Sequence, residues 1–92
     1  MRLSIVVNDP ADQFLVRRIP SGQATVEWNT LLGRTYWVEY SDDAGMSWET
    51  VLAPVAGTGL KVVWLDNGPP KTDADSAARP ARSYRVILQA NP

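Results

Sequence analysis

The side chains best suited to chemistry lie in one short stretch, residues 41–49, with the sequence SDDAGMSWE. This stretch contains three carboxylates and two hydroxyls, on Asp42, Asp43, Glu49, Ser41 and Ser47. Clustered carboxylates bind calcium, and paired carboxylates also act as general acid and base. Calcium takes six or more oxygen ligands, so these three acids supply too few without help from elsewhere. The stretch is a structural turn, a calcium site or a ligand contact, and we expect the turn.

Groups that could support catalysis are scarce in the rest of the chain. The 92 residues include no cysteine and no histidine, so a thiolate nucleophile and the commonest general base and metal ligand are missing. Ser41, Ser47 and Ser83 therefore have no histidine to activate them, and no glycine-rich phosphate loop is present. We expect no catalytic residue, no cofactor and no bound metal.

The charge of the chain argues against a nucleic-acid partner. The net charge is -1 and the isoelectric point is near 5.2, whereas phosphate binding requires clustered Lys and Arg. Only Arg17-Arg18 and the group Arg79, Arg82 and Arg85 are locally basic. We interpret both groups as solvated surface, with anion binding as the alternative. The longest apolar run near the N-terminus, LSIVVN, is too short for a membrane span or a signal peptide, so we expect no membrane insertion.

The elements that position these side chains are predicted to be β-strands. Apolar residues alternate with polar residues along most of the sequence, and no helical stripe is longer than about a turn. Turn-forming residues separate seven predicted strands, at Arg2–Asn8, Gln13–Ile19, Ala24–Asn29, Thr35–Ser41, Trp48–Leu52, Leu60–Asp66 and Ser83–Gln89. Short strands at this spacing predict a single all-β domain over residues 1–92, an antiparallel β-sandwich of about seven strands.

The alternation also assigns the two faces of each predicted strand. Residues predicted to point into the core are Val26, Trp28, Tyr36, Val38, Tyr40, Leu60, Val62, Trp64, Tyr84, Val86 and Leu88. Residues predicted to point outward, onto a wetter face, are Trp37, Glu39, Ser41, Arg85, Ile87 and Gln89.

One long polar segment interrupts the pattern, from Asp66 to Arg82, with the sequence DNGPPKTDADSAARPAR. Segments of this length without secondary structure are uncommon in compact domains and are either functional or mobile. We interpret it as a mobile crossover between the two sheets, with a functional loop as the alternative.

The ordered motifs VEW, GRTYWVEYS, SW, WLDNGPP and RSYRVIL resemble the fibronectin type III or immunoglobulin-like domains found near the C-termini of large secreted bacterial proteins. The resemblance implies that Trp28 lies in the core and that Tyr84 braces the sandwich near a corner. It also implies an accessory module whose partners are neighbouring domains of the same polypeptide, at the cell surface or outside the cell. The chain ends soon after the YRV strand and has two strands before the motifs, so the order of strands stays open.

A second resemblance concerns the turn itself. Ser41, Asp43, Gly45 and Trp48 fit the pattern SxDxGxxW, which is similar to the Asp-box hairpin of sialidases and related β-propellers. In such a turn, Ser and Asp side chains accept hydrogen bonds from backbone donors, Gly has a positive φ and Trp packs beneath. We expect both Asp42 and Asp43 to cap backbone donors. One copy cannot build a propeller, which repeats a four-stranded blade at least four times.

Two functions therefore stay open, and both are non-catalytic. The first is an accessory or spacer module of a larger extracellular bacterial protein. The alternative is a carbohydrate-binding module, in which an outward-facing Trp37 presents its ring beside Glu39 and Arg85. Protein adhesion through an exposed strand edge is a further possibility. The solvent exposure of Trp37 distinguishes the first two, because a sugar-binding ring must be accessible.

Overall fold

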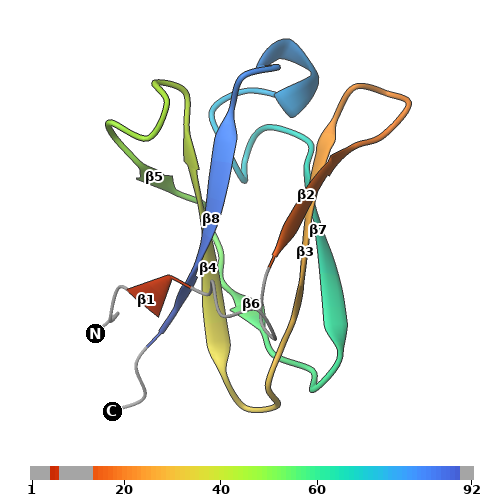
Figure 1. Cartoon of the computed structure of the whole chain (residues 1–92), viewed down its shortest axis with the longest axis vertical. Helices are drawn as coiled ribbons and strands as arrows, with labels where there is room; N and C mark the ends of the chain where they lie inside the picture. Colours follow the sequence, from red (N-terminus) through yellow and green to blue (C-terminus); the bar gives the residue numbers. More distant parts are fainter. Residues whose placement is uncertain (1–4, 7–13, 90–92) are drawn as a thin grey trace.

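A computed structural model describes residues 5–6 and 14–89, which fold into two antiparallel sheets (Figure 1). The first sheet contains β1 (Ile5–Val6), β8 (Ser83–Leu88), β4 (Thr35–Ser41), β5 (Glu49–Thr50) and β6 (Val55–Ala56). The second sheet contains β2 (Leu15–Arg18), β3 (Ala24–Asn29) and β7 (Lys61–Asp66). Every strand pairing in these residues is antiparallel. The prediction of an all-β chain with antiparallel sheets is confirmed.

The strand boundaries agree best for the long strands. β3 and β4 have the predicted bounds, and β7 and β8 differ from the prediction by one residue at one end. The predicted strand Trp48–Leu52 is reduced to the two residues of β5, while β6 was not predicted, because Val55–Ala56 lies in a glycine-rich stretch. Most of the predicted strand Arg2–Asn8 lies outside the described residues, as does Gln13 at the start of the second predicted strand.

Both sheets contribute to one core, which lies between them. Val26 and Trp28 come from β3, and Val38 and Val86 come from the other sheet; all four are at most 1% exposed. Aromatic rings cross the interface edge to face, with centroids 6.0 Å apart for Trp28 and Tyr36 and 6.1 Å apart for Trp64 and Tyr84. Such pairs add to the burial of the rings themselves. In a domain of this size, which has little apolar volume, they form much of the core.

Four side-chain placements differ from the sequence prediction. Ile87, predicted to face water, is 1% exposed, because it lies between β4 and β1 and has a strand on either side. Glu39 and Ser41 are also buried rather than on a wet face, and their burial is tolerated because their oxygens hydrogen-bond to neighbouring side chains. Leu60, predicted to be in the core, is exposed, because it precedes β7 and lies in the turn.

The segment between β7 and β8 does cross from one sheet to the other, as predicted, but it is not a simple mobile loop. It contains a 3-10 turn, η1 (Ser76–Ala78), in which the Ala77 amide donates to the side chain of the N-cap residue Asp75. Thr72 and Ser76 are buried, and the Ser76 hydroxyl donates a hydrogen bond to the Asp66 carbonyl and accepts one from the Ala24 amide. No helix in the described residues is long and apolar enough to span a membrane.

Candidate functional site

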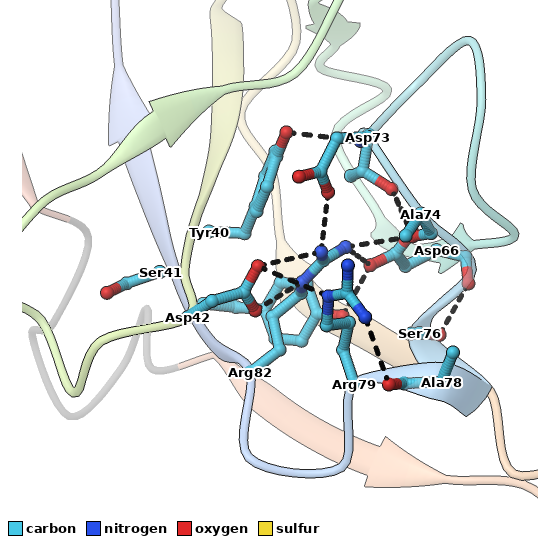
Figure 2. Close-up of polar contacts among 12 residues, drawn as sticks. Tyr40, Ser41, Asp42, Asp66, Asp73, Ala74, Ser76, Ala78, Arg79 and Arg82 are labelled. Atoms are coloured by element: carbon cyan, nitrogen blue, oxygen red, sulfur yellow. Dashed lines mark hydrogen bonds and ion pairs between the residues drawn. The ribbon is translucent and has the colours of Figure 1, made fainter.

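The most concentrated group of charged side chains surrounds Arg82, which directly precedes β8 (Figure 2). Its side chain is fully buried. Nε and Nη2 donate to the two oxygens of Asp42, at 2.8 and 2.9 Å, and Nη2 also donates to Asp73 at 2.6 Å. Nη1 donates to Asp66 at 3.1 Å and to the Ala74 carbonyl at 3.0 Å. A guanidinium has five N–H donors, so these five hydrogen bonds use its full capacity.

Asp66 is the buried anion of this group. It ends β7, is 0% exposed, and accepts hydrogen bonds from four donors. Besides Arg82, these are the Tyr84 hydroxyl at 2.5 Å, the Thr72 hydroxyl at 2.6 Å and the Gly68 amide at 3.2 Å. A buried carboxylate is tolerated only when it is paired and hydrogen-bonded, and Asp66 meets both conditions.

The protonation states of the group follow from this geometry. Burial raises the pKa of Tyr84, and its hydrogen bond to Asp66 raises that pKa further, so the phenol keeps its proton. Burial alone would lower the pKa of Arg82, but hydrogen bonds to Asp42, Asp66 and Asp73 outweigh it and raise the pKa. The hydrogen bond from Arg82 lowers the pKa of Asp42. These shifts stabilise fixed charges and move proton exchange away from neutral pH, the opposite of what general acid–base catalysis needs.

The structure brings Ser41, Asp43, Gly45 and Trp48 together in one turn. The Ser41 hydroxyl accepts from the Gly45 amide at 2.8 Å and donates to Asp43 at 2.7 Å. Asp43 also accepts from the amide and the hydroxyl of Ser47, at 2.9 and 2.5 Å. Hydrogen bonds from Ser47 and Ser41 lower the pKa of Asp43 to about 2. Gly45 has a φ of +86°, which L side chains rarely adopt, and a β-carbon at this position would lie 3.5 Å from the Trp48 ring.

Asp42 does not have the role that was predicted for it. Instead of capping a backbone donor, its carboxylate forms a bidentate pair with Arg82 and lies 3.8 Å from Nε of Arg79. The interpretation of Arg82 as solvated surface is therefore wrong. Arg18, in the other basic group, also has intramolecular partners, because its guanidinium donates to the carbonyls of residues 22, 76, 79 and 80.

A hollow of about 220 Å³ lies between the turn and the Arg82 group, lined by the turn together with Tyr40, Glu49 and Asp73. Its carboxylates are largely committed: Asp42 and Asp73 bind Arg82, and Asp43 binds the two serines. In residues 5–6 and 14–89 no three Asp, Glu, His or Cys side chains are grouped to hold a metal ion.

The residues predicted as a ligand surface, Trp37, Glu39 and Arg85, do lie together on the outer face of β4 and β8. Glu39 and Arg85 are directly opposite in the register and form an ion pair at 2.8 Å, and Glu39 also accepts from Thr50. The Arg85 guanidinium lies 4.3 Å from the centroid of the Trp48 ring, a cation–π contact. Trp37 is half-buried, and its indole N–H donates to Gln89 at 2.7 Å. The polar groups of this surface are thus bonded to one another.

Sequence reasoning missed the Arg82 group because its members are far apart along the chain. Arg82 is 40 residues from Asp42 and 16 from Asp66, so only the fold brings them together. One signal was present: an acidic residue ends the strand before the long loop, and an arginine ends the loop itself. Opposite charges at the two ends of a crossover are consistent with an ion pair that closes it.

Comparison of the chain with models of protein families, with curated proteins and with solved structures gave no match.

Proposed function

We propose that this chain is a non-catalytic accessory or spacer module of a larger, extracellular bacterial protein, with a fibronectin type III or immunoglobulin-like sandwich fold. One observation carries the proposal. The Arg82 group is the largest cluster of charged side chains described, and the polar atoms of its guanidinium are hydrogen-bonded to other residues of the same chain. A site that binds a ligand or performs chemistry keeps polar groups available for that purpose. The module's partners are the neighbouring domains of the same polypeptide.

In such a module, the Arg82 group links the two sheets and the crossover loop to one another. Arg82 and Asp42 adjoin strands of the first sheet, and Asp66 ends a strand of the second, so their hydrogen bonds join the sheets at one end. Asp73 and the Ala74 carbonyl add the crossover loop to the same group. Small domains have little core to spare, and a network of this kind supplies additional links between the layers.

Carbohydrate binding has weaker support. Sugar recognition on a sheet requires accessible aromatic faces with free polar groups beside them. Trp37 is half-buried with its N–H occupied by Gln89, and Glu39 is 3% exposed. The Trp37 ring is partly covered, and the Trp37 N–H and the Glu39 carboxylate already have hydrogen-bond partners within the chain, which disfavours a sugar ligand.

Titration with a panel of oligosaccharides and polysaccharides tests the proposal, with tryptophan fluorescence followed in the parent and in Trp37→Ala. We expect no saturable change in either protein. Leu52→Ala is the matched control, because Leu52 is an exposed side chain outside the surface of Trp37, Glu39 and Arg85. Saturable binding that disappears in Trp37→Ala and persists in Leu52→Ala would replace the spacer role with sugar binding.

A further inference from the structure

Three exposed leucines gather at one end of the molecule, where β3 connects to β4 and β6 connects to β7. Leu31, Leu32 and Leu60 are 58%, 79% and 73% exposed, and together they form the leucine tip. Their two loops, residues 30–34 and 57–60, lie at the lower end of Figure 1. A single exposed leucine is normal on a protein surface, but several together mark an interaction surface.

Hydrogen bonds hold the two loops together. The Thr30 amide and hydroxyl both donate to the Leu60 carbonyl, at 3.1 and 2.7 Å, and the Thr58 amide donates to the Thr30 hydroxyl at 2.9 Å. The hydroxyl of Tyr36, a core residue, accepts from the Leu31 amide at 2.9 Å. Because the loops are already ordered, little conformational entropy is lost when a partner covers the leucines.

The second loop also lies against the first through Leu32 and Arg34. A β-carbon at Gly59 would lie 3.7 Å from the β-carbon of Leu32, so Leu32 is beside the loop that carries Leu60. The Gly57 amide donates to the Arg34 carbonyl at 2.7 Å. The three leucines therefore belong to one apolar tip and are not separate exposed residues.

Two cations flank the leucine tip. Arg34 ends the first loop and Lys61 begins β7, and both side chains are exposed. In the part of the chain that the structure describes, neither side chain has an ion pair or a hydrogen bond. Residues 29–35 and 54–62 contain no Asp or Glu, and the carboxylates of the Arg82 group lie at the opposite end, where β4 and β7 end. The tip is therefore apolar and its surroundings are positive, although the net charge of the chain is -1.

We propose that the leucine tip is a membrane-contact site, which enters the headgroup region of a bilayer that contains anionic lipid. The leucines reach the boundary between headgroups and acyl chains, and Arg34 and Lys61 bind lipid phosphates beside them. Long basic side chains suit this position, because their stems are apolar and their charges stay at the polar surface. A second copy of the chain fits the tip less well, because the cations of the two copies would face each other.

The contact involves only the two loops, and it does not depend on the spacer role. Its expected affinity is low, because the apolar tip is small. A single myristoyl chain binds a bilayer only marginally and reversibly, and the tip should behave similarly, with half of the protein bound at roughly 0.1–1 mM lipid.

Sedimentation with vesicles tests the proposal on the full chain, using equimolar phosphatidylcholine and phosphatidylglycerol, with pure phosphatidylcholine as the neutral comparison. Leu32→Ser should lower the partition coefficient by about tenfold, because an apolar side chain no longer enters the bilayer. Leu52→Ser is the matched control and should leave it unchanged, because Leu52 is 67% exposed and its amide donates to the crossover loop, away from the tip.

A second pair of variants tests the cations. Lys61→Gln should lower the partition coefficient for the anionic vesicles by about fivefold, and binding to pure phosphatidylcholine should be weaker still. Arg79→Gln is the matched control, because it changes the net charge equally but lies in the crossover loop at the opposite end. Its partition coefficient should stay close to that of the parent.

The chain has no cysteine, so a single introduced cysteine can carry an environment-sensitive fluorophore. A label on Leu32→Cys should shift its emission to the blue when anionic vesicles are added, whereas a label on Leu52→Cys should not. This readout places the contact at the tip independently of any change in affinity.

Several results would overturn the inference. One is absence of sedimentation with anionic vesicles at a lipid concentration about tenfold above the expected range. Others are equal losses in Leu32→Ser and Leu52→Ser, equal losses in Lys61→Gln and Arg79→Gln, or equal emission shifts of the two labels. Self-association of the parent that is lost in Leu32→Ser, measured by sedimentation equilibrium without lipid, would assign the tip to a second copy of the chain instead.

Discussion

At the scale of single residues, Arg82 and Asp66 are the described charged side chains whose replacement should be most costly, because both are 0% exposed. Removing one partner of a buried ion pair leaves the other without compensation, and the cost exceeds what the pair itself contributes. Exposed ion pairs behave differently, since water replaces a lost partner at little cost. The solvent exposure of an arginine therefore determines how much its replacement lowers the free energy of unfolding.

Arg82→Gln should reduce the free energy of unfolding by roughly 3–5 kcal/mol, the usual cost of breaking a buried pair, as measured by chemical denaturation. Arg79→Gln is the matched control, because its side chain is 45% exposed and its Nε lies 3.8 Å from Asp42. That control should lose about 1 kcal/mol or less. Equal losses in the two variants would mean that the buried network does not stabilise the fold.

Gly45 has a constrained backbone conformation in the Ser41–Trp48 turn, where Ala44 also has a positive φ, of +61°. At a φ of +86°, a β-branched side chain is strained, although a β-carbon would have only ordinary contact with the Trp48 ring at 3.5 Å. Gly45→Val should therefore cost about 1–3 kcal/mol in thermal unfolding. Gly45→Asn is the control, because asparagine tolerates a left-handed backbone and should lose less. An unchanged unfolding temperature in Gly45→Val would remove the Asp-box interpretation of the turn.

At the scale of elements, the turn between β4 and β5 makes the unfolding temperature depend on pH in the acid range. Hydrogen bonds from Ser47 and Ser41 lower the pKa of Asp43 from its ordinary value of 3.8 to about 2, and the pKa of Asp42 is lowered by Arg82. A carboxylate whose pKa is lower in the folded state stabilises the protein above its unfolded pKa and loses that contribution as pH falls. The unfolding temperature should be flat from pH 7 to about 5 and fall between about pH 4 and 2.

Asp43→Asn isolates the contribution of the turn to this acid transition. The variant cannot titrate at residue 43, so its unfolding temperature should decline less steeply between about pH 4 and 2 than that of the parent. Its stability at pH 7 will be lower, because the amide accepts weaker hydrogen bonds from Ser47, so the slopes and not the absolute values are compared. Parallel slopes would show that Asp43 titrates in the same way folded and unfolded.

Local sequence patterns predicted the elements whose structure is determined locally. Alternation placed β3 and β4 with their observed bounds, and the spacing of Ser41, Asp43 and Gly45 predicted a turn with a positive φ, which Gly45 has. The two-residue strands were less predictable, because β5 and β6 exist only by pairing with β4. Propensity is a weak guide where a segment is ordered by its neighbours.

The crossover loop was misjudged for a related reason. Its polar, proline-containing sequence is typical of a mobile segment, yet Thr72 and Ser76 are buried and hydrogen-bonded. Their partners are the carboxylate and the carbonyl of Asp66, the residue at which the loop begins. A segment that is ordered by contacts with its own first residue has no periodic pattern of apolar residues, so its sequence does not indicate that it is ordered.

At the scale of the whole molecule, the first and last strands lie side by side, with β1 on the outer edge of β8. The sequence could not determine this arrangement, because pairing between the two ends of a chain leaves no local signal.

The whole molecule should also be indifferent to calcium, although its turn contains several acids. Asp42 and Asp73 bind Arg82, and Asp43 binds Ser41 and Ser47, so a cation would have to displace these partners. A ligand present at a hundredfold excess over its Kd stabilises the native state by about 2.7 kcal/mol. For a domain of this size, that corresponds to a rise in unfolding temperature of roughly 10 °C or more.

We expect the same unfolding temperature in millimolar calcium and in a chelator, measured by differential scanning calorimetry, with magnesium as the control for ionic effects. A rise with calcium alone would establish a bound ion and assign these carboxylates to a metal rather than to the fold.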